Sequence, residues 1–364
     1  MKIALLNLPF DNNYGGNLQR YALVKILQYM GHDVVHIYLK NRCFLPWYIK
    51  PYSYIKRIIK RFVLGQDIYI LCEKHQNEKM ERIYDIIYPF YDKYIPHTSP
   101  VETIKEIKQV CKNGFDVYIV GSDQVWRKNM TKMIGIENYF FKFLDNNGAK
   151  RVAYAVSMDT SFGEFNSYDI RRLSKLYAKF DAVSVRELSA LKQLDIYGWN
   201  TVKAEIALDP TLLLSPDNYL VLINNKTTSD LTSGKVFAYI LDQTSDKLQI
   251  VEDKAKSMGT EYLLLGIENS DTTIEQWLSN IYHSLFVVTD SYHGIVFSIL
   301  FNKPFMFLGN ERRGNFRIDS LLSLLGIEDI DNCEFEWQKY NDKLSELRKQ
   351  SFKFLHNALI CDNK

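Results

Sequence analysis

A histidine in the segment 290–294 (Asp-Ser-Tyr-His-Gly) has the strongest chemical setting in this sequence. The segment follows a short apolar run and starts a second one, which predicts that His293 lies at a helix N-terminus. Backbone N–H groups there attract anions, and an imidazole can bind an anion or transfer a proton. Gly294 lets a ligand approach the backbone, and Ser291 is a further candidate contact. The alternative is a capped helix start with a structural histidine.

Three arginines are candidate anion ligands. Arg186 ends a short apolar run, and a guanidinium binds carboxylates and phosphates through two parallel hydrogen bonds. Arg312 and Arg313 follow another apolar run and can add positive charge. The alternatives are an ion pair between Arg186 and Glu187, and a solvated loop around the other two arginines.

Two polar loops, residues 13–17 and 121–124, and one serine, Ser157, are candidates for binding a neutral group such as a sugar. In the first loop, Gly15 and Gly16 let a ligand approach the backbone next to a helix start. In the second loop, the Asp123 carboxylate can orient or deprotonate a hydroxyl. The alternative for both is helix capping, by Asn17 in the first loop. The candidate residues are Asn13, Gly15, Gly16, Asn17, Gly121, Ser122, Asp123, Gln124 and Ser157. The first loop lacks the GxGxxG spacing of a nicotinamide-cofactor site.

These groups follow predicted strands. Short apolar runs alternate with segments of helical periodicity, which is typical of parallel sheets covered by helices on both faces. Ligands of such sheets bind beyond the carboxyl ends of the strands. The predicted strands are Ile3–Leu8, Val34–Leu39, Val117–Val120, Val152–Val156, Ala182–Val185, Val236–Leu241, Tyr262–Leu265, Phe286–Thr289 and Phe305–Leu308. We therefore predict an α/β fold of two doubly wound, Rossmann-like domains that face a cleft.

The length of 364 residues suits two domains. We predict an N-terminal domain over residues 1–204, a linker region over 205–234 and a C-terminal domain over 235–336. Residues 337–364 read as a terminal helix that can cross back to the first domain.

The segment 46–62 mixes lysines and arginines with aromatic and aliphatic residues, and no acid occurs between Asn41 and Gln66. Such a segment can lie on an anionic membrane or contact a lipid-linked acceptor. The alternative is a helix with one packed face and one solvated face.

Composition excludes several classes of protein. A net charge of +2 is too small to indicate a nucleic-acid partner. The five cysteines are scattered without a CxxC pair, which favours a reducing cytoplasm over a disulfide framework or a cysteine zinc site. We expect no metal or cofactor. No signal peptide or membrane-spanning run is visible, so we expect a cytoplasmic protein that can touch the inner face of the membrane. The oligomeric state cannot be read from these patterns.

Six segments, taken in order, resemble the polysaccharide pyruvyl transferase family. They are NYGGNLQ (13–19), GSDQVW (121–126), AYAVS (153–157), SVRE (184–187), LDPTLLL (208–214) and DSYHGIVFSILFNKPF (290–305). The resemblance implies a fold like that of the GT-B glycosyltransferases. It also implies transfer of pyruvate from phosphoenolpyruvate to a sugar of a cell-surface polysaccharide or its precursor, often as a ketal, without a separate cofactor.

The resemblance also assigns roles. Arg186 matches an arginine that holds phosphoenolpyruvate, and His293 matches a histidine of donor binding or proton transfer. Many family members carry an arginine where this chain has Ser291, so we expect Arg312 or Arg313 to replace it, or a different donor. We expect the acceptor on the N-terminal domain and the donor on the C-terminal one. The alternatives are a GT-B glycosyltransferase that uses a nucleotide-sugar and a non-catalytic binding protein of an envelope pathway.

Overall fold

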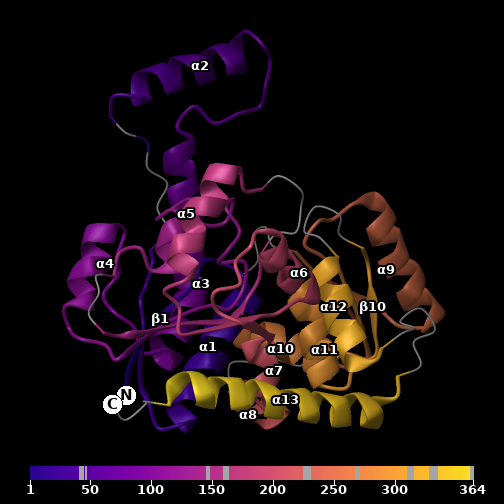
Figure 1. Ribbon diagram of the computed structural model, residues 1–364. Helices are drawn as coiled ribbons and strands as arrows, with labels where there is room; N and C mark the ends of the chain where they lie inside the picture. The colour runs from indigo at the N-terminus through magenta and orange to yellow at the C-terminus, as the bar shows by residue number, and fades with distance from the viewer. Residues whose placement is uncertain are drawn as a thin grey trace.

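Two parallel β-sheets, one in each half of the chain, organise the structure (Figure 1). This computed structural model describes residues 1–40, 45, 47–144, 148–158, 164–223, 231–266, 271–309, 315–327 and 335–360. Within these ranges no helix has the length and apolar content needed to cross a bilayer.

The first sheet has the strand order β2-β1-β3-β4-β5-β6, with every pair parallel. Alternate residues of a strand face opposite sides, so Ile3 and Leu5 pack toward α1 while Ala4 and Leu6 pack toward the opposite layer. The strands are β1 (Lys2–Leu6), β2 (Asp33–His36), β3 (Val117–Val120), β4 (Lys150–Val156), β5 (Ala182–Val185) and β6 (Ala204–Ile206). The helical elements of this half are α1 (Tyr14–Tyr29), α2 (Lys50–Phe62), α3 (Cys72–Tyr94), α4 (Ile104–Cys111), η1 (Ile136–Phe140), α5 (Ser167–Tyr177) and α6 (Leu188–Ile196).

The second sheet has the order β10-β9-β7-β8 and is also parallel. Its strands are β7 (Val236–Tyr239), β8 (Tyr262–Leu265), β9 (Phe286–Thr289) and β10 (Phe305–Phe307). The helices of this half are α9 (Ser245–Ser257), α10 (Ile274–His283), α11 (Tyr292–Leu300) and α12 (Phe316–Leu325). Phe237 and Tyr239 pack in the core that includes α10 and α11, whereas Val236 and Ala238 pack against α9.

A shared hydrophobic core joins the two halves. One cluster of buried side chains contains Leu18 of α1 and Val287 of β9. At its edge the Tyr14 ring stacks on Trp277 with centroids 5.5 Å apart, and the Tyr14 hydroxyl donates to the carbonyl of Thr272 at 3.0 Å. Because apolar surface is buried across this junction, the carboxyl ends of the two sheets are held facing each other.

The chain between the sheets is folded. The segment predicted as a linker region contains α7 (Pro210–Leu213) and α8 (Pro216–Ile223), and Leu212 and Tyr219 are completely buried.

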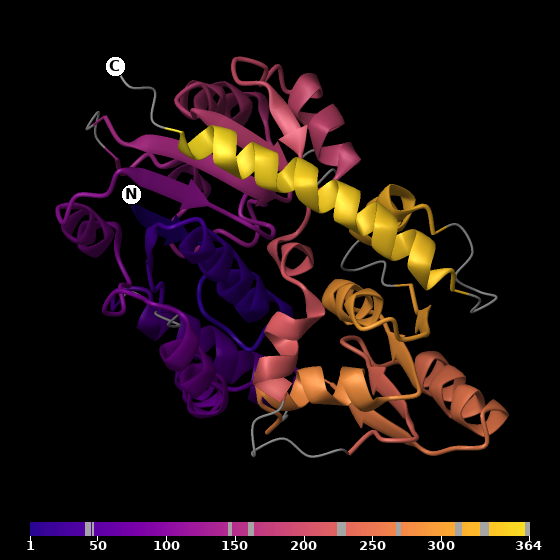
Figure 2. The ribbon, with the colours of Figure 1, turned by 90° about the horizontal axis from the view of Figure 1, so that it is seen from below.

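Helix α13 (Trp337–Leu359) runs across both halves (Figure 2). Next to its start, Phe335 packs on Phe305 of the second sheet at 4.9 Å, and near its end Phe354 packs on Tyr154 of the first at 6.1 Å. Between these points the Ser351 hydroxyl accepts from the backbone N–H of Leu208 at 2.9 Å. The helix therefore fastens the segment between the sheets to both.

Several local predictions were wrong in detail. Strand β7 ends at Tyr239 rather than Leu241, and β10 ends at Phe307 rather than Leu308. Strand β2 ends at His36 rather than Leu39, because the chain then pairs with residues 97–101. Strand β1 ends at Leu6. Helix α1 begins at Tyr14 with Asn13 as its N-cap, so the alternative of Asn17 as the cap was wrong.

We expect Leu355→Ala to lower the free energy of unfolding by about 2–5 kcal/mol, because Leu355 is completely buried and the substitution leaves a cavity in the shared core. Lys353→Ala on the exposed side of α13 should change it by less than about 0.5 kcal/mol. Urea unfolding measures both; equal effects would mean that α13 does not support the core.

Candidate active site

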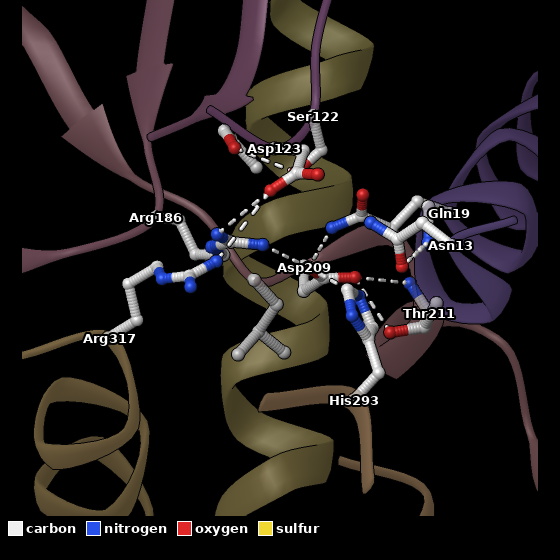
Figure 3. Close-up of polar contacts among 12 residues, drawn as sticks. Asn13, Gln19, Ser122, Asp123, Arg186, Asp209, Thr211, His293 and Arg317 are labelled. Atoms are coloured by element: carbon white, nitrogen blue, oxygen red, sulfur yellow. Dashed lines mark hydrogen bonds and ion pairs between the residues drawn. The ribbon is translucent and has the colours of Figure 1, made fainter. Parts of the chain in front are cut away.

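Asp209 joins the two halves of the chain at the site (Figure 3). It is the N-cap of α7, and its Oδ1 accepts from the N–H and hydroxyl of Thr211 at 3.0 and 2.7 Å. Its Oδ2 accepts from Arg186 Nη1 at 2.6 Å and from the side-chain amide of Gln19. Nε2 of His293 lies 3.7 Å from the same oxygen, which is longer than a hydrogen bond.

The charges of this centre are buried and balanced. Burial raises the pKa of the Asp209 carboxyl, but the His293 ring and the Arg186 guanidinium lower it by more, and the net pKa lies well below the ordinary value. Burial lowers the pKa of Arg186, but Glu187 and Asp209 outweigh this and raise it well above the ordinary value. Asp209 and Arg186 therefore form an ion pair at neutral pH.

Arg317 brings a second guanidinium to the site from α12. Its Nη1 lies 3.7 Å from Asp123 Oδ1, the oxygen that is also 3.7 Å from Arg186 Nη2. The guanidinium carbons of Arg186 and Arg317 lie 4.5 and 5.7 Å from the centre of the Tyr292 ring, within cation–π distance. Burial and the charge of Arg186 lower the pKa of Arg317. Two cations held this close favour a bound anion.

A cavity of about 350 Å³ lies at these groups, which is a suitable size for a small ligand. Its lining comes from loops beyond the carboxyl ends of both sheets, from the end of β7 and from the first turns of α11 and α12. The polar lining residues are Asp11, Asn12, Asn13, Asp123, Gln124, Tyr239, Asp290, Ser291, Tyr292, His293 and Arg317. Five of the residues singled out from the sequence are therefore brought together here, namely Asn13, Asp123, Gln124, Ser291 and His293.

The other sequence candidates that the structure describes do not line this cavity. Only 3% of the Arg186 side chain is exposed, and its contacts are with Asp209, Glu187 and Asp123. The amide of Asn17 donates to the carbonyls of Asp11 and Asn13 and so shapes the loop. Gly16, Gly121, Ser122, Ser157 and Gly294 are buried. Arg312 and Arg313 lie outside the described residues.

Gly15 determines where His293 sits. A Cβ atom at position 15 would come within 2.0 Å of Cγ and Nδ1 of the imidazole. The first turn of α1 and the first turn of α11 can therefore approach only because residue 15 has no side chain.

Asp123 has an unusual backbone conformation. Its φ of +70° lies in the left-handed region, which costs energy for a residue with a side chain. The carbonyl of Asp123 accepts from the N–H of Ser157 at 2.8 Å, and the neighbouring Ser122 hydroxyl donates to Ala155 at 2.8 Å. Strand β4 thus holds Asp123 in place with its carboxylate toward the two arginines.

Asp11 is a further titratable group of the cavity. Burial raises the pKa of its carboxyl, against the charge of Arg20 and a hydrogen bond from the N–H of Asn13. A carboxyl with a raised pKa in a cavity is a candidate for proton transfer. Asp11 also lines a neighbouring cavity of about 1290 Å³, which shares Leu8 and Met130 with the first and extends to α2 and α3.

Sequence reasoning missed Asp11, Asp209 and Arg317. Asp209 belongs to the segment LDPTLLL, and its position shortly after β6 matches the strand-end pattern of the other candidates. Arg317 lies inside an amphipathic helix and carries no local signal. In the part of the chain that the structure describes, no cluster of His, Cys, Asp and Glu is arranged to hold a metal ion.

The two facing parallel sheets define the class of protein, a two-domain α/β protein of the GT-B type. A protein of Listeria monocytogenes assigned as a UDP-N-acetylglucosamine 2-epimerase has a similar fold, with a TM-score of 0.50 and 10% identity over 100% of this chain and 91% of that one. The UDP-GlcNAc 2-epimerase of Neisseria meningitidis is also similar, with a TM-score of 0.45 and 12% identity over 96% and 100%. The predicted fold class is confirmed.

A model of the family described as polysaccharide pyruvyl transferase matches residues 13–312. Because the match covers most of the chain, this protein belongs to the polysaccharide pyruvyl transferase family. The family identifies it as a transferase. No curated protein matches the chain.

We expect Asp209→Asn to lower the free energy of unfolding at neutral pH by about 3–5 kcal/mol, because it removes one of the two carboxylates that pair closely with the buried Arg186 charge. The native pKa of Asp209 is lowered, so its stabilising effect is present above the unfolded pKa and is lost as the pH falls. The difference in the free energy of unfolding between wild type and variant, measured by urea unfolding, should therefore decrease as the pH is lowered. The exposed Asp195→Asn serves as control; a pH-independent difference would contradict the assignment.

We expect Gly15→Ala to displace the His293 ring and reduce transferase turnover by about a hundredfold, the scale of an ångström-sized misplacement. Gly16→Ala is the matched control, because a Cβ there meets only the Asn13 side chain at 3.2 Å. Turnover and melting temperature should be measured for both. Similar turnover in the two variants would show that the position of His293 is unimportant.

Proposed function

We propose that this chain transfers pyruvate from phosphoenolpyruvate to a sugar of a cell-surface polysaccharide or its precursor and closes a ketal across two hydroxyls. The observation that carries the proposal is a cavity in which Arg317 and His293, from the second half of the chain, face the acidic and amide side chains of the first half; the one acid from the second half, Asp290, is paired with Lys247. Phosphoenolpyruvate bears a carboxylate and a phosphate close together, which need cationic and N–H partners. Sugar hydroxyls need carboxylates and amides.

Arg317 is the cation that we assign to the donor. The family's frequent arginine is replaced by Ser291, whose hydroxyl accepts from the N–H of Gly294 at 3.4 Å and caps α11. Arg317 lines the cavity, whereas Arg186 is almost completely buried. On this proposal Arg317 contacts the donor, and Arg186 positions Asp123, Asp209 and the ring of Tyr292 around it.

The repulsion between the donor and the acids of the cavity is limited by existing partners. Lys247 Nζ lies 2.7 Å from Asp290, which also accepts from the backbone N–H groups of Leu241 and Asp242 at 2.6 and 3.1 Å. Asp123 faces two guanidinium groups. An anion on the α11 and α12 side therefore meets carboxylates whose charge is already compensated.

The reaction then follows from proton placement. The imidazole of His293, beside the Asp209 carboxylate, gives a proton to the methylene carbon of phosphoenolpyruvate while a sugar hydroxyl attacks the adjacent carbon. Phosphate leaves, and a second hydroxyl closes the ketal. The sugar hydroxyls lose two protons. One returns to His293 and replaces the proton that formed the methyl group, and the other leaves with phosphate. Asp123 and Asp11 are the groups that we assign to the hydroxyls.

A melting experiment with phosphoenolpyruvate and, separately, nucleoside diphosphates tests the donor. At a hundredfold excess over its dissociation constant the donor should stabilise the protein by about 2.7 kcal/mol. Arg317→Ala should weaken donor affinity by about ten- to a hundredfold, since it removes a charged hydrogen-bonding partner. The exposed Arg171→Ala is the matched control and should bind normally. Stabilisation by nucleotides alone would contradict the proposal and favour a nucleotide-sugar enzyme.

Phosphate release from phosphoenolpyruvate with a sugar acceptor tests the chemistry. His293→Gln should retain the melting shift but lose about 10²- to 10⁴-fold in turnover. If His293→Gln lost the melting shift but kept normal turnover at saturating phosphoenolpyruvate, His293 would act only in donor binding.

A further inference from the structure

Helix α2 presents its apolar side to solvent. Ile55, Ile58, Ile59 and Phe62 follow the i, i+3, i+4, i+7 spacing of one helix face, and they are 58%, 43%, 47% and 72% exposed. Just before the helix, Trp47 is 80% exposed. Figure 1 shows α2 projecting beyond the end of α3, away from both sheets. A surface helix normally turns this face toward the protein, so the exposure requires an explanation.

The polar side of α2 fixes this orientation. Both Nη atoms of Arg57 donate to the Glu73 carboxylate of α3, at 2.8 and 2.6 Å, and Nη1 also donates to the carbonyl of Ile70 at 3.1 Å. Arg61 donates to the carbonyl of Ile68 at 3.2 Å. Turning the apolar face inward would break these contacts, so the face is held outward by the fold itself.

Charge identifies what covers this face. Lys56 and Lys60 flank the apolar side chains, Lys50 lies at the start of the helix, and residues 47–66 contain no acid. A second copy of the chain placed face to face would bring these cations together. An anionic bilayer instead accepts the isoleucines and Phe62 at its acyl boundary, the tryptophan at its interface and the cations at its phosphates.

We propose that the face of α2 formed by Ile55, Ile58, Ile59 and Phe62, with Trp47 and the flanking lysines, docks the protein on an anionic lipid bilayer. Lys50 and Tyr54 of the same helix line the larger cavity, which shares Asp11 with the candidate active site. The bilayer then lies beside a route into the site. If the proposed transfer is correct, the acceptor of that transfer is a glycan carried on a membrane lipid.

Vesicle binding tests the docking directly. The purified full chain is sedimented with vesicles of phosphatidylcholine alone and of phosphatidylcholine with phosphatidylglycerol. Binding should require the anionic lipid and weaken with salt, and brominated lipids should quench tryptophan emission in wild type but less in Trp47→Phe. Equal binding to neutral vesicles, or none to either, would overturn the proposal.

Variants identify the face. Ile55→Glu/Ile59→Glu and Lys56→Glu/Lys60→Glu should each reduce binding to anionic vesicles by more than about tenfold, since each basic residue near such a surface is worth roughly fivefold. Ile196→Glu/Val221→Glu is the matched control, because both side chains are exposed elsewhere, at 73% and 72%. A wild-type dimer that Ile55→Glu/Ile59→Glu converts to monomer, without vesicle binding, would assign the face to self-association instead.

These outcomes are separate from those of the donor experiment. The melting shift with phosphoenolpyruvate should be unchanged in Ile55→Glu/Ile59→Glu, because the substituted side chains do not line the site cavity. Vesicle binding without a donor shift would retain the docking and reject the transfer, and the reverse result would do the opposite.

Discussion

The buried Asp209 carboxylate is the interaction on which the rest of the site depends. It is contacted by Gln19 from the first helix, by Arg186 from the end of β5 and by His293 from the second half of the chain. A buried charge is tolerated only when it is paired and hydrogen-bonded, so the carboxylate requires Arg186, Gln19 and Thr211 beside it, and the His293 ring of the other half lies 3.7 Å away. The closure of the two halves and the assembly of the site are therefore one structural event, reinforced by the shared hydrophobic core and by α13.

The same electrostatic logic extends outward to the cavity. Arg186 neutralises buried acids and has little exposure, whereas Arg317 carries charge to the cavity wall across the ring of Tyr292. Because of this division, positive charge from α12 reaches the cavity next to the start of α11, where Ser291 is uncharged. A site built in this way separates the groups that maintain the fold from those that can meet a ligand.

The structure also separates two kinds of surface. The site lies between the sheets, where Asp123, Asp209 and Asp290 each face a cation. Helix α2 projects away from both sheets. Its ion pair with Glu73 holds an apolar face in solvent, where that face has no partner among the described residues. Exposed apolar surface of this kind has a cost that a partner removes, and the surrounding cations select one with negative charge. On the two proposals, chemistry and docking belong to different elements, whose cavities share Leu8, Asp11 and Met130 in their linings.

The sequence by itself determined the fold class, because short apolar runs alternating with helical periodicity permit few arrangements other than covered parallel sheets. It also predicted the strand-end positions of Asp123 and His293, since parallel strands bring their carboxyl ends to one edge. Only the tertiary structure decided that Asp209 is the shared partner of Gln19 and Arg186 and that Arg317 supplies the cation that lines the cavity. Those contacts join residues far apart in the chain, and no local periodicity or turn signal records them. The outward face of α2 was likewise undetermined, because an amphipathic pattern predicts two faces and only the Arg57–Glu73 pair shows which one meets solvent.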